Sequence, residues 1–222
     1  MLKINNLTKW YPTPMGRRYV FRDLSFEFPA NTNIGLIGRN GAGKSTLMRL
    51  LAGTDTPNAG SIITDGRVSW PVGLGGGFQG SLTARENAQF ICRINGANGA
   101  AMRRVIAFVE EFAEIGDYFD LPVSTYSSGM RSRVSFGLSM AFDFDYYLID
   151  ELMAVGDPSF KAKSQQVMSA RLAGANVIMV SHSMPLIQRY CSMVVLVDKG
   201  NTVLYENLAE GIKAYENTGL ST

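Results

Sequence analysis

The sequence predicts an α/β fold in which a parallel sheet carries a glycine-rich loop and a helical segment is inserted into the chain. Three observations support this prediction. An apolar strand runs into glycines and then a helix at residues 31–52. Two further apolar runs, 146–151 and 175–183, have polar residues at their carboxyl ends, and the stretch from about 83 to 118 has helical periodicity. A chain of 222 residues suits one domain with an inserted subdomain.

The first part of the chain alternates between β-rich runs and one helical pattern. Phe26 and Phe28 stand between polar neighbours, as in a strand with one buried face. Leu47, Leu50 and Leu51 instead recur at helical spacing before a glycine stop. We expect strands at residues 2–11, 21–28 and 31–38, a helix at 44–52, and a strand with a turn at 60–70.

The middle of the chain changes character at residues 71–80, PVGLGGGFQG, which are too rich in glycine for a regular element. We expect a flexible junction there, followed by a helical insert. One predicted helix has an apolar face at Val105, Ile106, Phe108, Val109 and Phe112. The expected boundaries place a helical subdomain at 79–142 and a core with an antiparallel β subdomain at 1–78 and 143–222. The core ends in a hairpin at 193–206 and a helix at 207–219.

A phosphate-binding motif lies between the strand at 31–38 and the helix at 44–52. Gly38, Gly43, Lys44 and Ser45 satisfy G-x-x-x-x-G-K-[ST]. The glycines let backbone N–H groups turn toward the phosphates, the lysine reaches the β and γ oxygens, and the serine offers a hydroxyl to Mg²⁺. The motif predicts binding of a nucleoside triphosphate in a P-loop NTPase core of the RecA-like type. Its expected nucleotide-binding residues are Gly38, Asn40, Gly41, Ala42, Gly43, Lys44, Ser45 and Thr46.

Two later strands end in candidate catalytic residues. The run YYLIDE places Asp150 where it can bind the metal and Glu151 where it can take a proton from the attacking water. His182, the one histidine of the chain, follows the strand NVIMV, where it can reach a γ-phosphate. We therefore expect catalysis from Lys44, Glu151 and His182, although a structural histidine or a solvated acidic turn would explain either segment alone.

Composition excludes several other classes. A net charge of +2, from 21 basic and 19 acidic residues, argues against nucleic-acid binding by electrostatics. Cys92 and Cys191 form no CxxC pattern, which favours a reducing compartment. The sequence shows neither a run of about 18 apolar residues nor a signal peptide, so we expect any work at a membrane to need another anchoring subunit.

Six segments in order, GRNGAGKST, SLTAREN, YSSGM, YYLIDE, AVGD and VSHS, together resemble the nucleotide-binding domain of ABC transporters over nearly the whole chain. In that family the signature, usually LSGGQ, contacts the ATP held by the P-loop of a second subunit. The resemblance implies this role for Ser127, Ser128 and Gly129, and a homodimer closed on two ATP molecules. A serine helix cap explains the same segment physically. The resemblance also implies that AVGD, with Asp157, runs across the dimer.

The resemblance implies two further nucleotide contacts. In this family an aromatic side chain near the first strand stacks on adenine, and LTKWYPTP offers Trp10 and Tyr11. Tyr11 matches the family pattern of a basic residue shortly before a tyrosine, so we expect Tyr11 to stack. The glutamine that contacts Mg²⁺ in this family usually lies further upstream of the SLTAREN segment than Gln79 does. Gln79 is therefore either a metal contact beside Ser45 and Asp150 or a surface residue.

Two segments depart from the common pattern of the ABC transporter family, and together with a third they indicate one branch of that family. The segment LGGGF, the signature YSSGM and the run DELMAVGD resemble ATPase subunits of exporters for capsular and related cell-surface polysaccharides. This resemblance implies a peripheral subunit on the cytoplasmic face of the inner membrane. Its partners would be a small multi-span permease and polysaccharide-assembly machinery, coupled through the loop at residues 71–79. Alternatives are export of a lipid or drug, a soluble ABC ATPase acting on ribosomes or DNA, and a small-molecule kinase.

Overall fold

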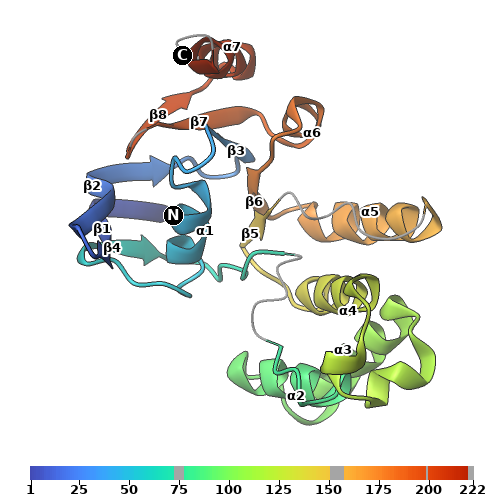
Figure 1. The fold of residues 1–222 in the computed structure, drawn as a ribbon. Coiled ribbons are helices and arrows are strands. Elements are labelled where there is room, and N and C mark those ends of the chain that lie inside the picture. The colour runs from blue at the N-terminus through green and yellow to red at the C-terminus, as the bar shows by residue number, and fades with distance from the viewer. Residues whose placement is uncertain (73–77, 151–157, 199, 220–222) are drawn as a thin grey trace. The chain divides into compact units, whose positions relative to one another are not determined.

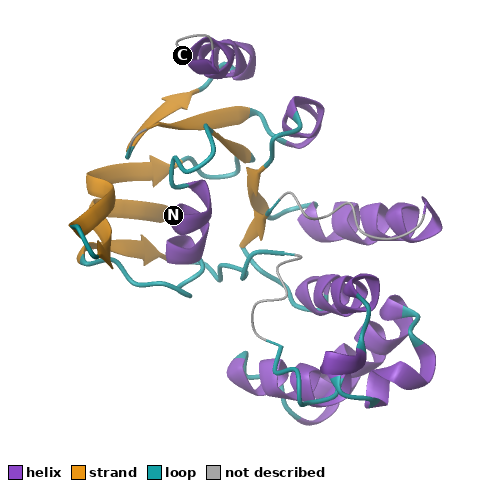
Figure 2. Cartoon of the chain, in the orientation of Figure 1, coloured by secondary structure: helices purple, strands orange, loops and turns teal. Residues whose placement is uncertain are grey.

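The strands form two sheets (Figure 2). The computed structural model describes residues 1–72, 78–150, 158–198 and 200–219. A three-stranded antiparallel sheet has the order β2-β1-β4, and a five-stranded sheet has the order β5-β6-β3-β7-β8. The strands are β1 (Leu2–Thr13), β2 (Gly16–Phe28), β3 (Ile34–Ile37), β4 (Ala59–Thr64), β5 (Tyr146–Ile149), β6 (Asn176–Val180), β7 (Met193–Asp198) and β8 (Asn201–Tyr205).

The helices fall between and after these strands (Figure 1). In the described ranges, none is both long and apolar enough to cross a membrane. They are α1 (Lys44–Leu51), α2 (Ala84–Ile94), α3 (Gly99–Ala113), α4 (Ser128–Met140), α5 (Pro158–Leu172), α6 (Met184–Tyr190) and α7 (Leu208–Gly219), with short 3₁₀ turns at Gly116–Asp120 and Val123–Thr125.

The antiparallel sheet is a long hairpin, β1 and β2, extended by β4. Both hairpin strands are longer than expected, because pairing continues to Thr13 and Gly16 at the tip. Antiparallel pairing also sets Tyr11 directly opposite Arg18. Side chains of directly opposed residues lie on the same face of a sheet, so this pair occupies one face.

The five-stranded sheet is parallel except at its β8 edge. Ile34 of β3 pairs with Ile178 of β6 on one side and with Met193 of β7 on the other, while β7 and β8 form the expected hairpin. All residues of β3 and β5 are buried, as continuous apolar runs in a parallel sheet usually are. Because β6 pairs in parallel with both β3 and β5, the carboxyl ends of these three strands come to the same edge of the sheet.

Helix α1 packs into a core that both sheets share. Leu47, Met48, Leu50 and Leu51 belong to one buried cluster with residues of β1 and β2 and of β3, β5, β6 and β7. Figure 1 shows α1 between the antiparallel sheet and β3. The P-loop that precedes α1 is therefore anchored at both of its ends in a packed core. These features are the α/β, P-loop NTPase fold that the sequence predicted.

Contacts divide the chain into two compact units. The first comprises residues 1–71, 144–151 and 174–222 and contains both sheets, and the second comprises 72–143 and 152–173. The expected helical subdomain, 79–142, did not include α5. In the structure α5 belongs to the second unit, called here the helical unit, because Phe160 packs edge-on against Phe112 at 5.2 Å between ring centroids.

The core of the helical unit is aromatic. Phe112 of α3 stacks on Phe136 of α4, with ring centroids 5.4 Å apart, and on Phe108 at 6.0 Å. Gly137 lets α4 approach, since a Cβ there would lie 2.9 Å from the Phe112 ring. At the surface of the unit, Arg85 donates hydrogen bonds to Asp120 and Glu110 and so ties α2 to the 3₁₀ turn and to α3.

Candidate nucleotide-binding site

The P-loop connects β3 to α1 and needs glycine for two different reasons. A Cβ at Gly38 would lie 2.2 Å from the carbonyl oxygen of Val197, so the neighbouring strand leaves no room for a side chain. Gly41 and Gly43 have φ of 79° and 111°, a left-handed region that favours glycine. A Cβ at Gly41 would meet nothing within 4 Å, so the backbone there borders open space. This loop can therefore bring its N–H groups close to a phosphate.

Lys44 holds the loop from inside. The residue is 6% exposed, and its Nζ donates hydrogen bonds to the carbonyl oxygens of Gly38 at 2.6 Å and Arg39 at 3.0 Å. A buried ammonium next to the amino-terminal end of α1 adds its charge to the positive end of the helix dipole. The loop thus offers backbone donors and a cation, which is the donor set that a triphosphate requires.

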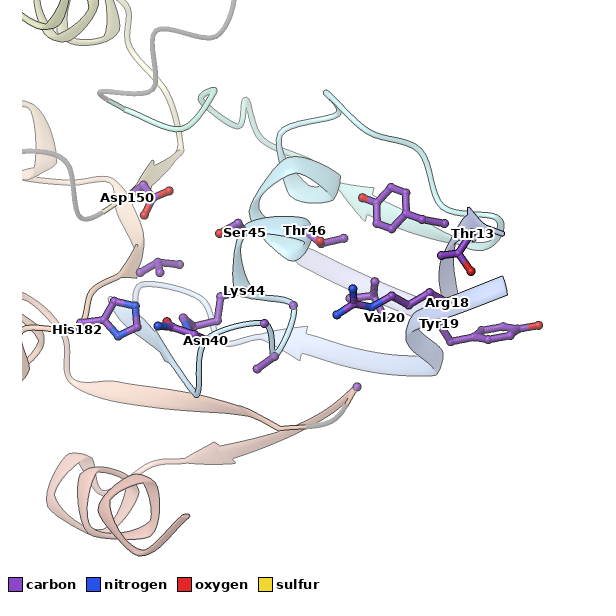
Figure 3. Close-up of a pocket in the computed structure, with 16 residues that line it drawn as sticks. Thr13, Arg18, Tyr19, Val20, Asn40, Lys44, Ser45, Thr46, Asp150 and His182 are labelled. Atoms are coloured by element: carbon purple, nitrogen blue, oxygen red, sulfur yellow. The ribbon is translucent and has the colours of Figure 1, made fainter. Parts of the chain in front are cut away.

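The P-loop forms one side of a cavity of about 730 Å³, a size common for small-molecule sites. Its lining comes from β1, β2, the P-loop, α1 and the ends of β5 and β6, all within the first unit. Figure 3 shows Lys44, Ser45, Asp150 and His182 toward one end, and Thr13, Arg18 and Tyr19 toward the other. The lining residues are Tyr11, Thr13, Arg18, Tyr19, Val20, Asn40, Gly41, Ala42, Gly43, Lys44, Ser45, Thr46, Asp150, Val180, His182 and Gly200.

Strand order brings the predicted catalytic residues to the P-loop. Asp150 follows β5 and His182 follows β6, and β6 lies directly beside β3, the strand that leads into the loop. Both side chains line the cavity together with Ser45. Open α/β sheets place their ligands at this edge, outside the carboxyl ends of the strands. The predicted Glu151 and Asp157 lie outside the described residues.

Tyr11, and not Trp10, lines the cavity. The hydroxyl of Tyr11 donates a hydrogen bond to Asp55 Oδ2 at 2.6 Å, and Arg49 Nη2 donates one to the Tyr11 oxygen at 3.3 Å. Trp10 instead packs under the guanidinium of Arg17, 4.3 Å from the ring centroid. Between the two aromatics that the sequence offered, Tyr11 is the one that lines the cavity.

The signature segment belongs to the helical unit. Ser127 is the N-cap of α4, where its Oγ accepts a hydrogen bond from the backbone N–H of Met130 at 3.2 Å, so the helix-cap interpretation is correct. Ser127 and Ser128 are exposed, and a Cβ at Gly129 would meet only Ser127 Oγ, at 3.8 Å. Tyr126, in the place of the usual leucine, is buried and donates its hydroxyl proton to the carbonyl of Tyr118 at 2.6 Å. The polar end of α4 is therefore open to a ligand.

Gln79 also belongs to the helical unit. Its side chain is exposed and donates to Ser81 Oγ at 3.4 Å, and its backbone N–H donates to Asn87 Oδ1 at 2.8 Å. The neighbouring residues 73–77 lie outside the described chain. Its role as a metal contact stays a prediction.

Sequence reasoning missed the residues that β2 contributes to the cavity, above all Arg18 and Tyr19. Arg18 reaches the cavity because the hairpin register sets it opposite Tyr11. No local motif marks these residues. The available signal was the succession of two β-rich runs, which form a hairpin that sets a residue of the second strand opposite Tyr11.

Comparison with known proteins gives three findings. The family model described as ABC transporter matches residues 21–154. The chain is 54% identical over 218 residues to the polysialic acid transport ATP-binding protein KpsT of Escherichia coli, covering 97% of this chain and 96% of that protein. It is 43% identical over 216 residues to the capsule polysaccharide export ATP-binding protein CtrD of Neisseria meningitidis serogroup B, strain ATCC BAA-335 / MC58, covering 97% of both.

Solved structures share the fold. An ATP-binding cassette, solved as a dimer in a post-hydrolysis state with ADP and Pi, superposes with a TM-score of 0.74 at 20% identity. The superposition covers 92% of this chain and 98% of that cassette. At this identity the match supports the arrangement of sheets and helices described above.

Proposed function

This chain belongs to the ABC transporter family as an ATP-binding, ATP-hydrolysing subunit, and from that premise we propose that it powers the export of a capsular or related cell-surface polysaccharide. The observation that carries the chemistry is the single cavity shared by Lys44, Asp150 and His182. The substrate class is inferred from two relatives, which are ATP-binding proteins for the transport of polysialic acid and the export of capsule polysaccharide. The chain matches both relatives over nearly their full length.

At the phosphate end of the cavity, the P-loop N–H groups and Lys44 hold the triphosphate. Ser45 and Asp150 supply a hydroxyl and a carboxylate, hard oxygen donors of the kind that Mg²⁺ prefers. Mg²⁺ held by these two residues would supply positive charge to offset the negative charge of the phosphate oxygens. Gln79 is a further candidate for this metal, carried by the helical unit.

Hydrolysis transfers the γ-phosphoryl group to water, and the protein contributes mainly position and charge. Glu151, next to Asp150, accepts the proton of the attacking water. His182 is exposed at the end of β6 and donates a hydrogen bond toward the γ-phosphate. Lys44 stabilises the negative charge on the same group. At the other end of the cavity, the ring of Tyr11 stacks on adenine.

We place the signature residues at the ATP of a second copy. Ser127 and Ser128 are exposed at the amino-terminal end of α4, where backbone N–H groups and the helix dipole favour an anion. The P-loop and this helix end lie in different units of one chain. A two-fold dimer pairs each P-loop with the other chain's Ser127, Ser128 and Gly129, which buries two ATP molecules between the copies.

This dimer would act as a peripheral subunit on the cytoplasmic face of the inner membrane, beneath a multi-span permease. ATP binding closes the two copies, the closure moves the permease, and hydrolysis reopens them. The loop at 71–79 is the proposed coupling segment, although most of it lies outside the described residues.

The test is mild crosslinking in native membranes, purification on this subunit, and mass spectrometric identification of what accompanies it. We expect a small multi-span membrane protein together with polysaccharide-assembly enzymes. Recovery of a permease for lipid or drug export would show that the exported substrate is a lipid or drug and not a polysaccharide. Recovery of ribosomal or DNA-bound proteins without a membrane subunit would overturn the transport function and leave the ATPase chemistry intact.

A further inference from the structure

The residue that holds Tyr11 lies outside the nucleotide cavity. Asp55, in the loop after α1, accepts the Tyr11 hydroxyl proton at Oδ2 over 2.6 Å. Its other oxygen, Oδ1, accepts a hydrogen bond from Lys9 Nζ, which also donates to the carbonyl of Thr56 at 2.8 Å. One carboxylate therefore joins the tyrosine to a lysine two residues before it in β1.

The Lys9 side chain makes this arrangement rigid. It is 7% exposed, whereas an ordinary surface lysine is largely solvated, so its ammonium depends on Asp55 and the Thr56 carbonyl for partners. Its Nζ also lies 4.7 Å from the centroid of the Tyr11 ring. The ring is thus fixed at its hydroxyl by Asp55 and at one side by the same ammonium that binds Asp55.

A second contact connects Tyr11 to the P-loop helix. Arg49 of α1 donates from Nη2 to the Tyr11 oxygen at 3.3 Å and to Thr46 Oγ1 at 3.3 Å. Thr46 lines the cavity in the first turn of α1. These contacts connect Asp55 through Tyr11 and Arg49 to Thr46 in the first turn of α1.

We propose that Asp55 is a positioning residue for the nucleobase: with Lys9, it holds the Tyr11 ring in the orientation that stacks on adenine. This inference rests on the proposed function, because it requires the Tyr11 ring to bind the base. Asp55 does not line the cavity, so its effect on ATP must pass through Tyr11. The phosphate end has its own anchors, the P-loop backbone and Lys44, which donates to the carbonyl oxygens of Gly38 and Arg39, so we expect it to keep its affinity for phosphate when Asp55 is replaced.

The test compares ATP with inorganic triphosphate, which has the phosphates and no base. Binding of both is measured by calorimetry for wild type, Asp55→Asn, Tyr11→Phe and the double variant. We expect each single variant to weaken ATP binding by about threefold to tenfold, because a ring that is no longer held in place gives up part of a stacking contact, with triphosphate affinity unchanged. The double variant should be no weaker than the weaker single variant, because both changes break one interaction. In ATPase assays KM rises by the same factor and kcat is retained.

Asp65→Asn is the matched control, since Asp65 is an exposed aspartate paired only with the chain's amino terminus in the described residues. It should leave both affinities unchanged. Tyr11→Phe keeps the Lys9–Asp55 pair and the ring, so it tests the proposal even if Asp55→Asn folds poorly.

Equal losses for ATP and triphosphate would show that Asp55 supports the whole site and would overturn the proposal, as would unchanged ATP affinity in both variants. Failure of the proposed function gives a different result. In that case wild type either does not bind ATP or binds ATP with an affinity that Lys44→Ala leaves unchanged.

Discussion

Lys44 Nζ donates a 2.6 Å hydrogen bond to the carbonyl oxygen of Gly38, six residues earlier, so the lysine closes the loop that carries it. The two residues are the first glycine and the lysine of one motif, and the bond links the end of β3 to the first turn of α1. A phosphate entering the loop meets an ammonium that is already in place, which keeps the ordering cost of binding low.

Replacing Lys44 by alanine removes the cation of the phosphate end. We expect kcat/KM for ATP to fall by about 100-fold or more, because a preorganised charge that stabilises the transition state is lost. Steady-state phosphate release measures this. Lys213→Ala, an exposed lysine on α7, is the control and should retain wild-type turnover. Wild-type turnover in Lys44→Ala would show that Lys44 has no role in ATP hydrolysis.

Gly38→Ala should destabilise the fold more than an alanine at another glycine of positive φ. The new Cβ would lie 2.2 Å from Val197 O, so β3 or β7 must shift. We expect a loss of about 2–4 kcal/mol in the free energy of unfolding by urea. Gly53→Ala, with φ of 68° and nothing within 4 Å of its Cβ, isolates the backbone cost, about 1 kcal/mol. Equal losses at the two positions would argue against the steric explanation.

Glu151→Gln keeps the shape of the side chain and removes the base. We expect ATP binding to persist, turnover to fall to background, and an ATP-dependent dimer to accumulate, because closure no longer ends in hydrolysis. Light scattering with and without ATP and Mg²⁺ measures the dimer. Turnover at the wild-type rate would exclude Glu151 as the base.

Ser127 combines a cap with a proposed contact to the partner's ATP, and two substitutions separate these roles. Ser127→Ala removes the cap of α4 and should cost about 1 kcal/mol of stability. Ser127→Asp keeps a good cap, so stability should be retained, but its charge repels a phosphate. We expect the aspartate variant to lose ATP-dependent dimerisation, measured in the Glu151→Gln background. If the Ser127→Asp variant still dimerises with ATP, Ser127 is not the residue that contacts the γ-phosphate.

The Lys9–Asp55 pair predicts a pH dependence of stability. Burial raises the pKa of the Asp55 carboxyl, but hydrogen bonds from Lys9, Tyr11 and Thr56 outweigh it and hold the pKa below its usual value. A pKa lowered on folding gives stability that is complete above the unfolded value, near 3.8, and is lost as pH falls through the folded value. The difference in unfolding free energy between wild type and Asp55→Asn should stay constant from pH 8 to about 5 and shrink below about pH 4. A difference that grows on acidification contradicts the assignment.

Local patterns predicted most elements but no helix at α5 or α6, and for α5 the reason is identifiable. Leu47, Leu50 and Leu51 produced the expected helical spacing, and all three are buried. In α5 the buried positions Phe160, Ser164 and Met168 also recur every four residues, but the middle one is a serine, so the apolar period is broken. The helix was therefore missed, and with it the packing of α5 in the helical unit.

The order of residues alone specifies the P-loop, because its glycines and lysine encode a backbone conformation within nine consecutive positions, and the same holds for the caps of α2 and α4. Thr83 and Glu86 complete a capping box just as their three-residue spacing allows. Only the folded chain decides that Asp150 and His182 line one cavity with the loop, that Arg18 lies opposite Tyr11, and that Asp55 holds Tyr11. These relationships depend on strand order, hairpin register and a partner 44 residues away. Such contacts form when distant apolar segments are buried together, and that burial is a property of the whole core rather than of any short segment.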